Sequence, residues 1–99
     1  MRILLVCAGG MSTSMLMKKL QKYAADNGIA LEEIIARGTG DYDEVYSRFD
    51  VILLGPQVSY QKDNIAKDTK KPIAVITPYD YAMGNAANIF KQVNSLTGR

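Results

Sequence analysis

The chain contains no histidine and no tryptophan, and one of its 99 residues is cysteine. Without histidine, the chain itself cannot supply an imidazole as a general base, phosphoryl carrier or metal ligand. With one cysteine it can form no internal disulfide, and such a thiol stays reduced most easily in the cytosol. We therefore expect a cytoplasmic protein with no metal site and no cofactor, in which any histidine chemistry comes from a partner.

Long apolar runs and a strong charge excess are also missing. The apolar run before Cys7 is too short for the core of a signal peptide, and no other segment approaches transmembrane length. The net charge is +2, and the lysines are spread among acidic residues. We expect no direct membrane insertion and no nucleic-acid partner. Residues 1–99 have the length of one compact domain.

Short apolar runs are separated by segments in which apolar residues recur at helical spacing. The first and third runs are apolar throughout, as expected for strands covered on both faces. Strands are predicted at residues 2–6, 29–37, 51–54 and 73–76. Helices are predicted at residues 12–27, 41–48 and 60–68 and from residue 82 onward, with a loop at residues 77–81.

Residues that favour helix ends support these boundaries. Asn27 and Gly28 tolerate the left-handed conformation that ends a helix. Asp41 and Glu44 resemble a capping box, and Ser59 is a candidate cap for the helix that follows it. The side chains of the last helix that we expect in the core are Met83, Ala86, Phe90 and Val93.

Strands that alternate with helices pair in parallel through right-handed connections. The two most apolar strands, the first and the third, belong at the centre, which gives the order 2-1-3-4. We therefore predict a single-domain α/β protein with an open parallel sheet of four strands and helices on both faces, flavodoxin-like or phosphatase-like. Ligands of such sheets bind beyond the carboxyl ends of the strands, where the winding reverses. That point brings together the loop after Cys7 and residues 55–60.

Cys7 ends the first strand and precedes a small, flexible loop that leads into a helix. Unpaired backbone N–H groups at a helix N-terminus, together with the helix dipole, favour a bound anion. Our hypothesis is that Cys7 is the catalytic residue and carries a phosphoryl group. The hydroxyl groups of residues 12–14 either contact this group or cap the helix. The loop expected to hold the phosphoryl group consists of Ala8, Gly9, Gly10, Met11, Ser12 and Thr13.

Two residues of the later loop are candidates for the rim of this site. Gln57 lies in the loop expected to face Cys7 and is a candidate polar contact. Tyr60 is the tyrosine best placed along the chain to face the site. The alternative for Tyr60 is a structural role, as we expect for Tyr79 and Tyr81.

Residues 7–14, CAGGMSTS, resemble the signature of the IIB components of the phosphoenolpyruvate-dependent sugar phosphotransferase system, in its lactose, cellobiose and diacetylchitobiose branch. Residues 53–60, LLGPQVSY, resemble the third-strand loop of the same family, and Lys71-Pro72 resembles its fourth-strand entry. The resemblance covers the whole chain in length and element order.

The resemblance implies that Cys7 accepts a phosphoryl group from a phosphohistidine of the IIA component. Cys7 would then transfer the group to a sugar bound by the membrane-embedded IIC component, a β-linked disaccharide such as cellobiose or diacetylchitobiose. The loop from Ala8 to Thr13 would bind the phosphoryl group mainly through backbone amides. A monomer suits a carrier that shuttles between two partners.

Three other functions fit the motifs less well. Enzymes of the low-molecular-weight tyrosine phosphatase or arsenate reductase type also place a cysteine loop after the first strand, but they have an arginine six positions after the cysteine. Here that position is Thr13, and Asp80 is either a general acid or the N-cap of the last helix. A nucleotide or flavin module would need a Gly-rich or lysine motif after the first strand. A thiol-redox protein would need a resolving cysteine.

Overall fold

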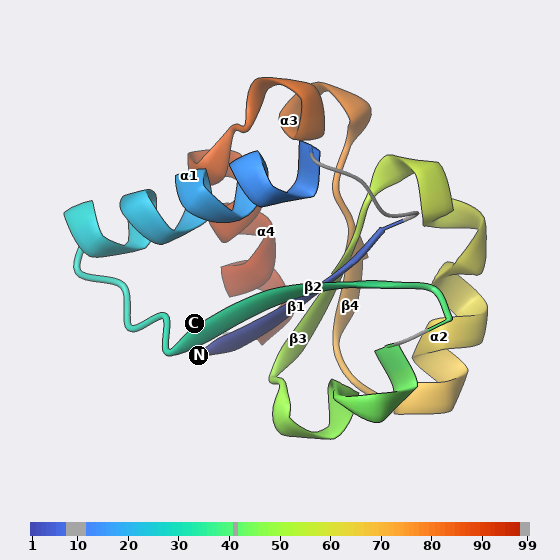
Figure 1. Cartoon of the computed structure of the whole chain (residues 1–99). Helices are drawn as coiled ribbons and strands as arrows, with labels where there is room; N and C mark the ends of the chain where they lie inside the picture. Colours follow the sequence, from blue (N-terminus) through green and yellow to red (C-terminus); the bar gives the residue numbers. More distant parts are fainter. Residues whose placement is uncertain (8–11, 41, 98–99) are drawn as a thin grey trace.

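The structure, a computed structural model, describes residues 1–7, 12–40 and 42–97, and the backbone alone of Ser12 and Thr13. Within these residues, four parallel strands form one sheet between two layers of helices (Figure 1). The strands are β1 (Arg2–Cys7), β2 (Glu33–Gly38), β3 (Val51–Leu54) and β4 (Ile73–Val75). The α-helices are α1 (Ser12–Asp26), α2 (Lys62–Thr69), α3 (Pro78–Met83) and α4 (Ala86–Thr97). Short 3₁₀ helices are η1 (Tyr42–Glu44), η2 (Tyr46–Arg48) and η3 (Pro56–Gln61).

The strand order is β2-β1-β3-β4, which confirms the predicted order. β1 pairs with β2 from Arg2 opposite Glu33 to Cys7 opposite Gly38, and its other edge pairs with β3. All these pairs are parallel, so the carboxyl ends of the strands meet at one edge of the sheet. Cys7 therefore lies at the edge where parallel α/β sheets bind their ligands.

Side chains of β1 point alternately to the two faces of the sheet, as the pleat of a strand requires. Ile3 and Leu5 belong to one core cluster, and Leu4 and Val6 belong to the other. All four are fully buried. Burying a side chain of this size contributes roughly 1.5–3 kcal/mol each. The strand is therefore held from both faces.

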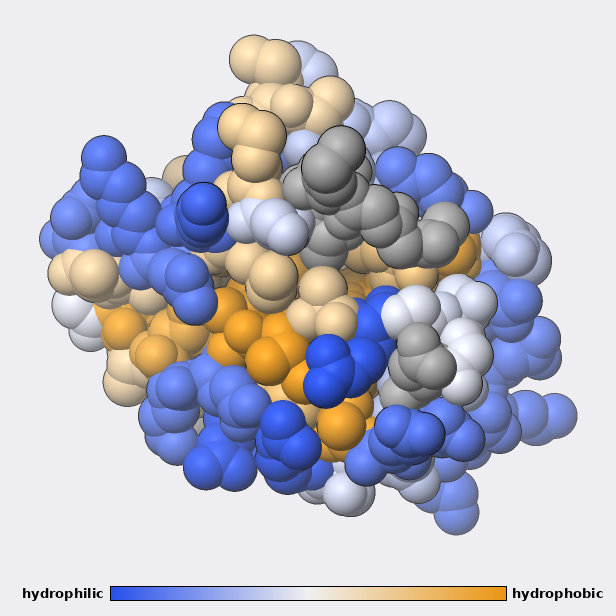
Figure 2. All heavy atoms as spheres, viewed as in Figure 1, coloured by the Kyte–Doolittle hydropathy of each residue, from blue (hydrophilic) through white to orange (hydrophobic). Residues whose placement is uncertain are grey.

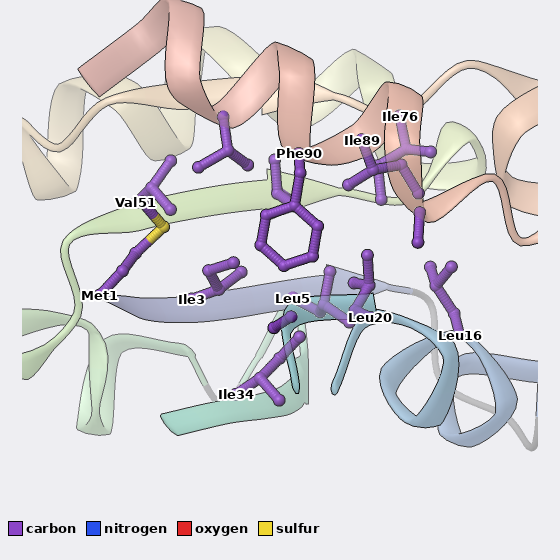
Figure 3. Packing of buried hydrophobic residues seen from close by; sticks show 14 of the residues in the cluster. Met1, Ile3, Leu5, Leu16, Leu20, Ile34, Val51, Ile76, Ile89 and Phe90 are labelled. Carbon is purple, nitrogen blue, oxygen red and sulfur yellow. The ribbon is translucent and has the colours of Figure 1, made fainter. Parts of the chain in front are cut away.

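The helices α1 and α4 cover the first face of the sheet. Leu16, Leu20 and Ala24 repeat at helical spacing along α1, and all three are buried. Figure 3 shows Phe90 pointing from α4 toward the strand that carries Ile3 and Leu5. The ring of Tyr23 on α1 stacks on that of Phe90 with 5.5 Å between centroids, which joins the two helices.

The second face is covered by α2 and by the irregular segments before and after β3. Phe49, Val58 and Ile65 are almost completely buried there, against Leu4 and Val6 of β1. The hydroxyl of Tyr42 donates a 2.8 Å hydrogen bond to Asp68, which ties η1 to α2. Helices on both faces of the sheet confirm the predicted fold class.

The second strand is shorter than the predicted strand at residues 29–37. The N–H of Ile29 donates to the carbonyl of Ala24 at 2.8 Å, and the N–H of Leu31 donates to that of Ile29 at 2.9 Å. These donors are used locally, at the end of α1 and in the following turn. Pairing toward β1 starts with the N–H of Glu32, which donates to the carbonyl of Met1 at 2.8 Å.

The single short helix predicted at residues 41–48 is divided into η1 and η2. The division falls before Tyr46, because Val45 adopts φ −130° and ψ −13°, outside the helical region. Asp41 lies outside the described residues, so its capping box with Glu44 stays a prediction.

Ser59 does not cap a helix, contrary to the prediction. It lies within η3, where its carbonyl accepts a hydrogen bond from the N–H of Lys62. Gln61, the residue before α2, is already in a helical conformation with φ −89° and ψ −2°. The chain thus enters α2 from an existing helical turn, and the predicted helix at residues 60–68 begins later, at Lys62.

Residues 77–81, predicted as a loop, contain the beginning of α3. The hydroxyl oxygen of Thr77 accepts a 3.1 Å hydrogen bond from the N–H of Asp80, and Pro78 occupies the first turn. Both features favour a helix start. The expectation that Asp80 caps the last helix is therefore wrong, because Asp80 lies inside α3.

The last helix begins at Ala86 rather than at residue 82. Gly84 ends α3 with φ +61°, a conformation that interrupts the helix before α4. This break leaves Met83 58% exposed, contrary to its predicted place in the core. Ala86, Phe90 and Val93 are buried, as predicted.

Replacing Leu20 by alanine should lower the free energy of unfolding by about 2–5 kcal/mol, because it empties a fully buried position between α1 and the sheet. The matched control is Lys18→Ala on the exposed face of α1, which should change stability by less than about 0.5 kcal/mol. Urea unfolding measures both. Equal losses in the two variants would contradict the packing described above.

A second prediction concerns Tyr42. Burial, together with the hydrogen bond to Asp68, raises the pKa of Tyr42 to about 12. An unfolded tyrosine titrates near about 10, so this contribution is fully present below about pH 10 and is lost as the pH rises toward about 12. Across that window, unfolding measurements should show a steeper loss of stability in the wild type than in Tyr42→Phe. Parallel pH curves would contradict it.

Candidate functional site

Cys7 is the last residue of the central strand β1, and its side chain is 2% exposed. Both faces of the strand are covered by helices, and both of its edges are paired. A group that reaches the sulfur must therefore approach from the carboxyl edge of the sheet. The fold fixes the position of this sulfur through the backbone of β1.

Gly55, the first residue after β3, lies directly against Cys7. Its N–H donates a 3.0 Å hydrogen bond to the carbonyl of Val6, which extends the pairing between the two strands. A β-carbon added at Gly55 would lie 3.0 Å from the Cys7 sulfur. The φ of Gly55 is −64°, which any residue adopts, so glycine is required here for space rather than for backbone conformation.

Gln57 reaches the same place from the first turn of η3. The same added β-carbon would lie 2.8 Å from the side-chain oxygen of Gln57. The Cys7 sulfur and the Gln57 carboxamide thus converge on one point beside Gly55. Gln57 as a residue is exposed, whereas Cys7 is buried.

The other predicted site residues are placed less closely or are not described. Tyr60 is 75% exposed. The side chains of Ser12 and Thr13 lie outside the described part of the chain, although both residues begin α1. The remaining residues of the predicted phosphoryl-binding loop also lie outside the described residues: Ala8, Gly9, Gly10 and Met11.

Asp80, considered as a general acid, is buried in α3 with 8% of its surface exposed. Its carboxylate accepts a 3.3 Å hydrogen bond from the side-chain amide of Asn88 on α4. This bond links α3 to α4 and gives the carboxylate a structural partner.

An exposed apolar surface lies on α1 and α3, and it was not predicted from the sequence. Met15 on α1 and Tyr79 and Met83 on α3 are each more than half exposed. Figure 2 shows apolar atoms over α3 and the beginning of α1. The amine of Lys19 donates a 3.2 Å hydrogen bond to the Met83 carbonyl and joins the two helices. The Thr-Pro pair that begins α3 is the signal that could have revealed this helix.

The described residues hold no group of three or more histidine, cysteine, aspartate or glutamate side chains able to bind a metal ion. In the same part of the chain, no helix is both long enough and apolar enough to cross a membrane.

The family described as "PTS system, Lactose/Cellobiose specific IIB subunit" matches residues 2–92. The chain belongs to this family. A cellobiose-specific EIIB component of Lactococcus lactis is 41% identical and is matched over 95% of this chain and 94% of its own length. The solution structure of a cellobiose-specific phosphotransferase IIB component from Borrelia burgdorferi matches 99% of this chain and 92% of its own, with 38% identity and a TM-score of 0.79.

A third relative has a different domain organisation. The lactose-specific EIICB component of Lactococcus lactis is 33% identical over 70% of this chain, which spans 12% of that protein's length. The predicted resemblance to the IIB components is thus confirmed, and the chain is a IIB subunit of the sugar phosphotransferase system, a transferase component.

Replacing Gly55 by alanine should lower the free energy of unfolding by about 1–3 kcal/mol, because the new methyl group must displace Cys7 or Gln57. Gly40→Ala is the matched control, since nothing lies within 4 Å of a β-carbon there. Chemical denaturation of both variants compares them. If Gly55→Ala is as stable as Gly40→Ala, the close approach at Cys7 is wrong.

Proposed function

We propose that Cys7 accepts a phosphoryl group from a phosphohistidine of the IIA component and passes it to a sugar bound by the membrane IIC component. The observation that carries this proposal is the position of the chain's one cysteine at the carboxyl end of the central strand, in a member of the IIB family. The chain lacks histidine, so the donor imidazole has no competitor within it.

The two transfers balance without any other reactant. In the first, the Cys7 thiolate attacks phosphorus, the S–P bond forms and the N–P bond breaks, and the imidazole leaves as a neutral ring if its other nitrogen is protonated. In the second, a sugar hydroxyl oxygen attacks the same phosphorus, the O–P bond forms and the S–P bond breaks. The hydroxyl proton passes to a base of the acceptor component or to water.

Phosphoryl transfer asks a protein mainly for positioning and for stabilisation of charge. The rigid position of Cys7 supports the first requirement. For the second we propose the backbone amides of residues 8–13, which comprise the segment between β1 and α1 and the first two residues of α1. Their role is supported by the place of this loop at the beginning of a helix, where amides are unpaired and the dipole is positive.

The proposed sugar is a β-linked disaccharide such as cellobiose or diacetylchitobiose, held by IIC and not by this chain. The cellobiose-specific names of two relatives support it. The EIICB name of a third relative supports a IIC partner. We further propose that the chain acts as a monomer on the cytoplasmic side of the membrane, where both partners can reach Cys7.

Hydrolysis by a phosphatase or arsenate reductase mechanism is the weaker alternative. Thr13 occupies the position at which those enzymes carry an arginine that clamps the phosphoryl group. The carboxylate of Asp80 is bonded to Asn88. Both features favour a carrier, which must keep the phosphoryl group from water until the sugar arrives.

The test is to incubate the wild type and Cys7→Ser with phosphoenolpyruvate, the general phosphotransferase components and a cognate IIA, near neutral pH. Intact mass and phosphosite mapping should show one phosphoryl group on Cys7 of the wild type, dependent on IIA, and none on Cys7→Ser. Turnover of an aryl phosphate that depends on Cys7, with no stable adduct, would overturn the carrier function and favour the hydrolase.

A further inference from the structure

We propose that Gln57 is a phosphoryl-contacting residue, whose side-chain amide donates a hydrogen bond to the phosphoryl group on Cys7, and that Gly55 lacks a side chain so that this contact can form. The inference rests on the proposed phosphorylation of Cys7 and adds a residue of the opposite loop to that site.

The geometry beside Gly55 supports this role. The Cys7 sulfur and the Gln57 side-chain oxygen lie 3.0 Å and 2.8 Å from the same point, the place of an absent β-carbon. A group bonded to the sulfur and directed toward the carboxyl edge therefore meets the Gln57 carboxamide. Rotation about the last side-chain bond exchanges the oxygen for the NH₂ group, which turns an acceptor into a donor.

The carboxamide is free to make this contact. In the part of the chain that the structure describes, it has no hydrogen-bond partner. By contrast, the amide of Gln92 donates to the Val75 carbonyl at 2.9 Å, and the oxygen of Gln61 accepts from Asn64 at 3.4 Å. Among the described residues, the Gln57 amide therefore differs from these two in having no partner and in lying beside the cysteine.

The backbone around Gln57 is held in place, so the amide is positioned before any phosphoryl group arrives. Pro56 lies in the first turn of η3 with its φ fixed by the ring. Val58 is 2% exposed in the core, and its N–H donates to the Gly55 carbonyl at 3.1 Å. Residues on both sides of Gln57 are therefore anchored.

A neutral amide suits a carrier. It stabilises the phosphoryl oxygens through a charge-assisted hydrogen bond without adding a positive charge. An arginine would clamp two oxygens at once and hold the group more tightly than onward transfer requires. A carboxylate of the same shape would repel the phosphoryl dianion and lacks the donor.

The experiment compares the wild type with Gln57→Glu and Gln57→Leu in phosphoryl transfer from phosphorylated IIA, with the rate followed at several IIA concentrations. We expect kcat to fall about tenfold or more in both variants, because each loses one hydrogen bond to a charged group. The KM for IIA should change little. Gln21→Glu, an equal charge change on an exposed residue of α1, is the control and should behave as the wild type.

The defect of Gln57→Glu should also shrink as the pH falls from about 8 to about 5.5. The neighbouring phosphoryl dianion raises the pKa of the introduced carboxyl above its ordinary value of about 4.3, so its protonation, which removes the repulsion and restores a donor, begins within this range. A merely structural role would not give this pH profile. Thermal unfolding verifies that each variant is folded.

If both Gln57 variants accept the phosphoryl group with the same kcat as the wild type, the inference is overturned and the proposed function stays intact. A change confined to the KM for IIA would also overturn it, because Gln57 would then contact the partner and not the phosphoryl group. Failure of the wild type to become phosphorylated would overturn both proposals.

Discussion

The burial of β1 on both faces is the constraint on which the rest of the structure depends. Its side chains alternate between two core clusters, while its backbone pairs with β2 on one edge and β3 on the other. A strand held in four directions has no room to shift. Cys7, at its end, is fixed with it, and the edge of the sheet leaves one direction of approach to the sulfur.

The neighbouring strand then decides what surrounds the sulfur. Because β3 runs parallel to β1 and in register with it, Gly55 lies beside Cys7. The turn after Gly55 places the side chain of Gln57 against the same space. The close approach excludes a side chain at Gly55 and leaves an uncharged amide at the site. Together with Thr13 at the position where phosphatases carry a clamping arginine, this arrangement supports the proposed carrier function.

Much of the fold could be predicted because strands buried on both faces leave continuous apolar runs in the sequence. These runs located β1 and β3 and placed them at the centre of the sheet. Cys7, which ends β1, was thereby placed at the carboxyl end of the central strands. The predictions were wrong where local hydrogen bonds, rather than apolar periodicity, decide the structure. The apolar pattern is weak in three such places: the six-residue helix capped by Thr77, the turn formed by the hydrogen bonds of Ile29, and the entry into α2 through η3.

The sequence by itself determined the chemistry: one thiol, no imidazole, glycines and hydroxyls after Cys7, and the motifs that mark the family. These properties depend on composition and on neighbours along the chain. The tertiary structure alone decided that Gly55 touches Cys7, that Gln57 shares its space and that Met83 faces solvent. Such contacts join residues that are distant in sequence or depend on where a helix breaks, so they follow from strand register and packing, which local propensity does not encode.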